Sequence, residues 1–157
     1  MICYKVVQGT KGGIVFLGEY KHTMDSKGRV VVPSKFREEL QQGCVITKGL
    51  DNCLQILTLK SWSEESESIA SLPKTDKTAR QFRRALFSGA VDGNLDTAGK
   101  LLIPENLRMY SDINIGEDVT ITGSGSVIEI WATRRWKKIQ AEADKAYANI
   151  NEVKGGS

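Results

Sequence analysis

Short apolar runs and turn residues alternate along much of the chain, in an order typical of an α+β protein. Residues 30–32 are three valines that follow a glycine, which predicts a tight turn and a short buried strand. Phe36 and Leu40 then fall four positions apart, as on one face of a short helix, and Gly43 is placed to end that helix. Residues 45–57 predict two more strands joined by a turn.

This series of elements occurs twice. Residues 24–33 and 95–104 share one pattern: Asp, then Gly, a basic residue, three apolar positions and Pro. The second copy continues with a helix around Leu107 and two strands within residues 119–131. A unit of about 40 residues buries little apolar surface alone, so we expect the two copies to form one pseudo-symmetric core.

Amphipathic helices are predicted between the copies and after the second one. The order Ser61-Trp62-Ser63-Glu64 has capping-box spacing, and residues 76–87 carry apolar side chains on one helical face. A C-terminal helix is indicated by apolar residues spaced three or four apart, at Trp136, Ile139, Ala143, Ala146 and Ile150. This stripe needs a cover, which could be the chain's own core or a neighbouring subunit.

Composition narrows the class of protein without identifying it. The 157 residues are 40% hydrophobic and 26% charged, with a formal net charge of +3, which is typical of a folded protein and too weak to indicate nucleic-acid binding alone. No apolar run approaches the roughly 18 residues of a membrane span, and the N-terminus lacks a secretory signal, so we expect a cytoplasmic protein. The chain has three cysteines, Cys3, Cys44 and Cys53, which form no Cys-x-x-Cys pair, so we expect buried thiols. His22 is the single histidine, and we expect it on the surface or in a strand. With so few ligands available, we expect no metal site and no cofactor.

Basic residues concentrate at the first turn and the helix after it. Residues 21–41 hold five cations and three acids: Lys21, Lys27, Arg29, Lys35 and Arg37 against Asp25, Glu38 and Glu39. A helix start favours anions, and flanking cations release counterions from DNA. We interpret Asp25 and Asp96 as acceptors inside their own turns that hold the basic residue outward. A solvated charged face is the alternative, and it is the favoured interpretation for the basic residues within 74–84 and 134–138.

The motif Gly18-Glu19-Tyr20-x-His22-x-x-Asp25-x-Lys27-Gly28-Arg29-x-x-x-Pro33-x-Lys35-x-Arg37 resembles the MraZ family of bacterial transcriptional regulators, which carry two tandem SpoVT-AbrB type units. Asp96-x-x-Gly99-x-x-x-x-Pro104-x-x-Leu107-Arg108 and Glu129-Ile130-Trp131 are similar to the second half of the family pattern. The resemblance covers about residues 17–136. Lys100 departs from it, because the family has arginine there. Lysine lacks the planar fork that meets phosphate or guanine, so we expect the second motif to be the weaker contact.

The resemblance implies DNA contacts led by Arg29 and Lys27 and assisted by Lys35, Arg37, Lys100 and Arg108, with Asp25, Gly28, Asp96 and Gly99 holding the turns. It implies a swapped-hairpin β-barrel built from two β-α-β-β units, and a ring-shaped, octamer-like homo-oligomer. The ligand would be double-stranded DNA, at direct repeats in the promoter of a division and cell-wall gene cluster, and the protein would associate with the nucleoid. Neither a membrane nor a small-molecule substrate is implied.

The expected organisation has five segments. They are an N-terminal extension at 1–14, a first unit at 19–63, a helical linker at 64–89, a second unit at 90–135, and a C-terminal helix and tail at 136–157. The extension is expected to be mobile. Its alternation of Ile2, Tyr4 and Val6 with other residues leaves an added edge strand as an alternative.

Two other function classes stay open. One is a ring-forming scaffold that binds proteins through the C-terminal helix. The other is an aspartic-protease-like hydrolase, because each copy offers Asp followed by Ser or Thr and then Gly. Lys27 and Ala98 interrupt that protease motif, and Arg29 or Lys100 would keep both acids ionised. We therefore expect a protein that is not an enzyme.

Overall fold

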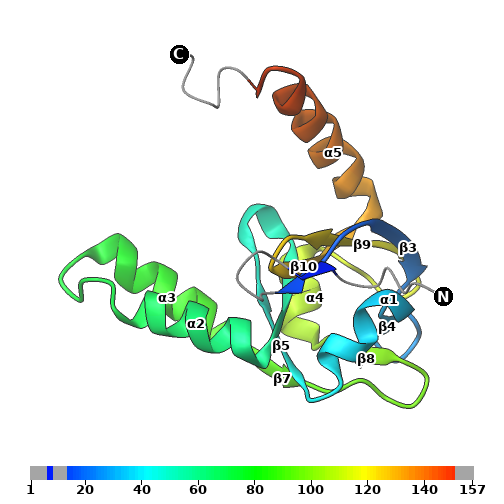
Figure 1. The fold of residues 1–157 in the computed structure, drawn as a ribbon, viewed down its shortest axis with the longest axis horizontal. Helices are drawn as coiled ribbons and strands as arrows, with labels where there is room; N and C mark the ends of the chain where they lie inside the picture. The colour runs from blue at the N-terminus through cyan, green and yellow to red at the C-terminus, as the bar shows by residue number, and fades with distance from the viewer. Residues whose placement is uncertain (1–6, 9–13, 151–157) are drawn as a thin grey trace.

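The computed structural model describes residues 7–8 and 14–150 (Figure 1). Its main sheet has six strands, each antiparallel to its neighbours. In spatial order these are β3 (Glu19–Thr23), β9 (Asp118–Ser124), β10 (Val127–Ala132), β6 (Leu54–Thr58), β5 (Cys44–Lys48) and β7 (Val91–Gly93). Two small antiparallel pairs complete the strands: β4 (Arg29–Val31) with β8 (Lys100–Leu102), and β1 (Val7–Gln8) with β2 (Ile14–Val15).

The two sequence copies exchange strands. β3 precedes the first turn but pairs with β9 of the second copy, while β7 precedes the second turn and pairs with β5 of the first. β4 pairs with β8, with Val30 opposite Leu101. Side chains from both copies form one buried cluster. The α+β class is therefore confirmed, whereas the closed swapped-hairpin barrel stays a prediction, because β3 and β7 are the edges of the six-stranded sheet.

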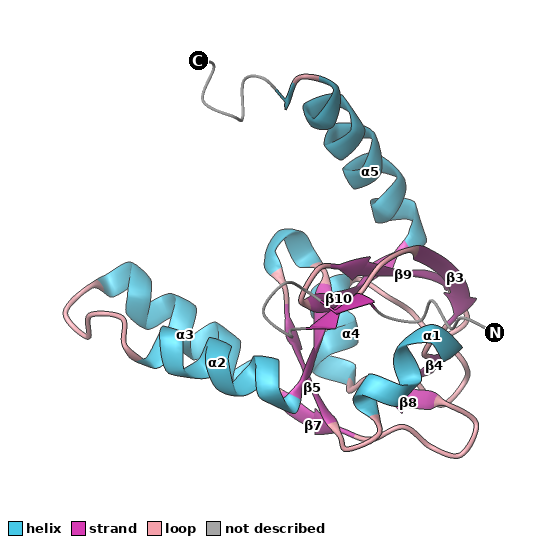
Figure 2. Ribbon diagram, viewed as in Figure 1, coloured by secondary structure: helices cyan, strands magenta, loops and turns pink. Residues whose placement is uncertain are grey.

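The helices fall into core helices and projecting helices (Figure 2). The core helices are α1 (Ser34–Arg37), which continues as a 3-10 turn (Glu38–Leu40), and α4 (Glu105–Ser111). A second 3-10 turn (Leu50–Asn52) joins β5 to β6. The projecting helices are α2 (Leu59–Ala70) and α3 (Lys77–Gly89), which form a hairpin, and α5 (Thr133–Ala148).

The first copy's helix anchors the core as the apolar spacing predicts. Pro33 precedes α1, where its missing N–H costs nothing. Phe36 is fully buried, and its ring packs edge-on against Phe16 and Tyr20 at centroid distances of 5.2 and 5.4 Å. Leu40, four positions on, is also fully buried. The helix that carries Lys35 and Arg37 is therefore held firmly against the sheet.

Three sequence expectations need correction. α2 begins at Leu59 rather than at Ser61, because the Thr58 hydroxyl caps the helix by accepting the Ser61 N–H. β3 and β7 extend each β-α-β-β unit by one strand. The stripe on α5 is covered by the core only at its start, where Trp136 lies 5.7 Å from the buried Trp131 between ring centroids, and none of the α5 residues is fully buried. By contrast, α3 follows its predicted range closely and is capped by Asp76.

The N-terminal extension is described only in part. Val7–Gln8 pairs with Ile14–Val15, and Phe16 is fully buried and bonded through its backbone to Gly125. The alternation at residues 2–6 lies outside the described residues, as does Cys3. In the part of the chain that the structure describes, no helix is both long and apolar enough to cross a membrane.

Both described cysteines are buried, free thiols, as predicted. Burial raises the pKa of Cys44 to about 11, and burial together with the Glu129 carboxylate raises the pKa of Cys53 further. Thiolate is the reactive form, so we expect iodoacetamide at about pH 8 to leave both cysteines unmodified in the native protein. Peptide mass mapping should find them alkylated only after unfolding in guanidinium chloride. Rapid alkylation of either one in the folded protein would contradict this burial.

Candidate nucleic-acid interface

Two matching turns precede the paired strands β4 and β8. Gly28 and Gly99 both have φ +77°, a left-handed conformation that glycine adopts without strain. Asp25 Oδ1 accepts the backbone N–H groups of Lys27 and Arg29, both at 2.9 Å. Asp96 Oδ1 accepts the equivalent N–H groups of residues 98 and 100, also at 2.9 Å. Each aspartate thus has the hydrogen bonds expected of a residue that holds its own turn.

The second oxygen of each carboxylate faces a cation of the other copy. Asp96 Oδ2 lies 3.1 Å from Arg29 Nη1. Asp25 Oδ2 lies 3.4 Å from Lys100 Nζ and 3.1 Å from Arg29 Nε. We call Asp25, Arg29, Asp96 and Lys100 the cross-repeat charge cluster. Their side chains are between 25% and 36% exposed, so a ligand can reach all four.

Hydrogen bonds and neighbouring cations keep both carboxylates ionised. The pKa of Asp25 is lowered to about 2, mainly by the Arg29 N–H, with smaller contributions from the Lys27 N–H, Lys100 and the Arg29 charge. The pKa of Asp96 is lowered mainly by the Lys100 N–H. Two ionised carboxylates do not match an aspartic-protease pair, in which the acids share one proton.

Arg37 and Arg108 occupy equivalent positions, each against the turn of the opposite copy. Arg37 Nε donates to the Val32 carbonyl at 2.9 Å, and Arg108 Nε donates to the Ile103 carbonyl at 3.0 Å. A Cβ on Gly99 would lie 2.4 Å from Arg37 Cζ, and one on Gly28 would lie 3.2 Å from Arg108 Nε. The two glycines thus leave space for these guanidinium groups, a packing role that sequence spacing did not reveal.

The other two candidate DNA contacts surround this centre less closely. Lys27 is exposed at the tip of the first turn, and Lys35 is exposed on α1 with its Nζ 5.9 Å from the Tyr20 ring centre. The structure therefore places Lys27, Arg29, Arg37, Lys100 and Arg108 on or against the two turns, and Lys35 beside them on α1. His22 lies on β3, so it is a strand histidine, one of the two positions that the sequence predicts. Burial and the Arg37 charge lower its pKa, so it adds no positive charge at neutral pH.

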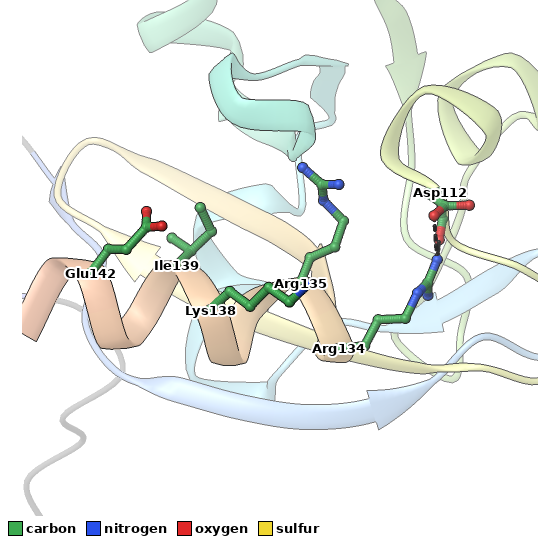
Figure 3. A pocket seen from close by; sticks show the side chains of 6 residues that line it. All are labelled: Asp112, Arg134, Arg135, Lys138, Ile139 and Glu142. Atoms are coloured by element: carbon green, nitrogen blue, oxygen red, sulfur yellow. Dashed lines mark hydrogen bonds and ion pairs between the residues drawn. The ribbon is translucent and has the colours of Figure 1, made fainter.

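The remaining basic segments have partners within the chain. Arg80 and Arg83 donate to the carbonyls of Lys74 and Leu72, which holds the connection between α2 and α3. Arg134 pairs with Asp112 at 2.6 Å (Figure 3) and also with Glu117. It lines an open pocket of about 400 Å³ at the start of α5, together with Asp112, Arg135, Lys138, Ile139 and Glu142. These contacts account for Arg80, Arg83 and Arg134 without a nucleic acid.

Comparisons with known proteins agree with the two-copy organisation. The family model described as "MraZ protein, putative antitoxin-like" matches the chain twice, over residues 15–85 and 86–153. A curated relative, the "Transcriptional regulator MraZ" of Halothermothrix orenii, is 43% identical over 136 residues. That alignment covers 87% of this chain and 94% of the relative.

Proposed function

Because this chain belongs to the MraZ family, we propose that it is a sequence-specific DNA-binding regulator of transcription and not an enzyme. The observation that carries the proposal is the joining of both Asp-x-x-x-Arg/Lys motifs into one partly exposed face by the pairing of β4 with β8. The relative's name, a transcriptional regulator, supports the same conclusion.

Each basic residue has a distinct part in this proposal. Arg29 and Lys27 make the leading contacts, because one extends from the turn into β4 and the other is exposed at the turn's tip. Lys35 contacts phosphate from α1, and Lys100 assists Arg29 from the second turn. Arg37 and Arg108 assist, each contributing a guanidinium that is anchored through Nε. Asp25, Gly28, Asp96 and Gly99 hold the geometry of the two turns.

The proposal also includes the DNA target, the place of action in the cell and the assembly of the protein. The target is a set of short direct repeats in the promoter of a bacterial division and cell-wall gene cluster that includes the protein's own gene, and the protein acts in the cytoplasm at the nucleoid. The two units, at 19–63 and 90–135, form a closed swapped-hairpin barrel, and several copies assemble into a ring. The unburied α5 supports subunit contact, and a ring engages successive repeats with an avidity above that of one copy.

An electrophoretic shift on the DNA upstream of the protein's own gene tests this function, with a scrambled DNA of equal length and composition as the control. We expect retardation of the promoter DNA at protein concentrations that leave the scrambled DNA free. No shift of either DNA by a folded, ring-sized protein would contradict the proposal and favour the scaffold alternative.

The asymmetry between the two motifs gives a second expectation. Arg29 reaches both aspartates, whereas Lys100 Nζ reaches only Asp25 and lacks a fork. Lys100→Ala should therefore weaken promoter binding less than Arg29→Ala does, and Lys100→Arg should tighten it or leave it unchanged. Parallel anisotropy titrations of the three variants measure this order, and the reverse order would assign recognition to the second motif.

A further inference from the structure

Two cations of the proposed interface, Arg29 and Lys100, are already neutralised by the two aspartates in the free protein. The cross-repeat charge cluster contains two carboxylates, one guanidinium and one ammonium group, and its formal charge is zero. A surface that only attracted phosphate would gain from leaving these cations unpaired. The pairing therefore has to be explained by something other than general attraction to DNA.

Neither carboxylate is free to move away when DNA approaches. Asp25 and Asp96 each commit Oδ1 to two backbone N–H groups, which fixes Oδ2 in its direction towards the opposite copy. Backbone hydrogen bonds also join the two copies at these turns: the Val32 N–H donates to the Gly99 carbonyl and the Ile103 N–H donates to the Gly28 carbonyl, both at 2.9 Å. The negative charges consequently stay in place in any complex that preserves the fold.

Fixed carboxylates treat a phosphate and a base edge differently. A phosphate near Arg29 is attracted by the cations but repelled by Asp25 and Asp96, so little net attraction remains. The major-groove edge of guanine presents neutral acceptors, O6 and N7, which carry no net charge to repel. Within residues 14–150, the side-chain hydrogen bonds of Arg29 use Nε and Nη1, which leaves Nη2 to donate to such an edge.

We propose that Asp25 and Asp96 are specificity-determining residues, which hold Arg29 and Lys100 in a neutral cross-repeat cluster that disfavours phosphate and favours a base edge. The inference rests on the proposed DNA-binding function and adds a role to the aspartates beyond holding their turns. Selectivity of this kind comes from weakening the wrong contact rather than from strengthening the correct one.

Asp96→Asn is the most direct test. The asparagine side-chain oxygen can still accept the two turn N–H groups, while the charge that faces Arg29 is removed. Glu65→Gln is the matched control, because it also removes one negative charge, at an exposed position on α2 outside the proposed interface. Dissociation constants of both variants and the unchanged protein are measured on promoter and scrambled DNA over a series of salt concentrations.

For Asp96→Asn we expect tighter binding to scrambled DNA, with a log–log salt slope steeper by about 0.9, equivalent to one more neutralised phosphate. Promoter affinity should stay the same or fall, so the ratio of promoter to scrambled affinity should drop at least about five-fold, the lower limit for one base-edge contact. Asp25→Asn should lower the ratio further, because Asp25 faces both cations. Glu65→Gln should leave the ratio unchanged.

Two outcomes separate this inference from the proposed function. If the unchanged protein shows no preference for promoter DNA, the proposed function fails and the inference fails with it. If the unchanged protein prefers promoter DNA and Asp96→Asn leaves the ratio of promoter to scrambled affinity unchanged, as Glu65→Gln does, only the inference is overturned. Asp96→Glu, which retains the charge, should keep the salt slope of the unchanged protein, and a steeper slope in that variant would also count against a charge effect.

Discussion

Arg29→Ala should remove most of the protein's affinity for promoter DNA while leaving the chain folded. Arg29 is the one residue of the cross-repeat charge cluster that contacts both aspartates, and it lies at the start of β4, about one-third exposed. Loss of a base-edge contact costs about 1–3 kcal/mol, which is about 5- to 150-fold in affinity. Assembly into a ring would multiply this loss over the subunits bound.

Fluorescence anisotropy titration measures this effect, with Arg84→Ala as the control. Arg84 is exposed on α3, so its replacement removes the same charge from a helix outside the proposed interface. We expect Arg84→Ala to bind promoter DNA like the unchanged protein. Unaltered promoter binding by a folded Arg29→Ala protein would remove Arg29 from the interface.

Phe36→Ala should cause one of the largest losses of stability available in this chain, about 3–5 kcal/mol. Phe36 has no exposed surface, and its ring makes edge-on contacts with both Phe16 and Tyr20, so truncation leaves a cavity beneath α1. The same change would loosen the helix that positions Lys35 and Arg37.

Urea unfolding followed by circular dichroism measures this loss. Tyr147→Ala is the matched aromatic control on α5, where the side chain is 76% exposed, and surface substitutions of this kind usually change the free energy of unfolding by less than about 0.5 kcal/mol. A Phe36→Ala protein as stable as Tyr147→Ala would contradict the buried position of Phe36.

The sequence predicts the local elements of this fold well, because their signals lie within a few residues of one another. The Asp-x-x-Gly turns, the strands at residues 30 and 101, and the helix that carries Phe36 all follow from short-range spacing. The sequence does not predict β3, because Glu19–Thr23 alternates between exposed and half-buried positions and contains little apolar surface. Its stability depends on pairing with β9, far along the chain.

The geometry of the candidate site is only partly accessible from sequence for the same reason. The spacing of Asp25 and Arg29 predicts a contact within one turn. The pairs between Arg29 and Asp96 and between Lys100 and Asp25 join residues far apart in the chain, and they exist because β4 pairs with β8. Likewise, the apolar stripe on α5 predicts a helix and a face, but a stripe does not specify which surface covers it.

Amide hydrogen exchange with and without promoter DNA tests most directly whether both turns form one DNA-binding face. If both turns form this face, DNA slows exchange in peptides covering residues 25–37 and 96–108 and leaves exchange in α3 and α5 unchanged. Scrambled DNA at the same concentration should give weaker protection of both turns. Protection confined to α3 or α5, or to the first turn alone, would contradict an interface shared between the two copies.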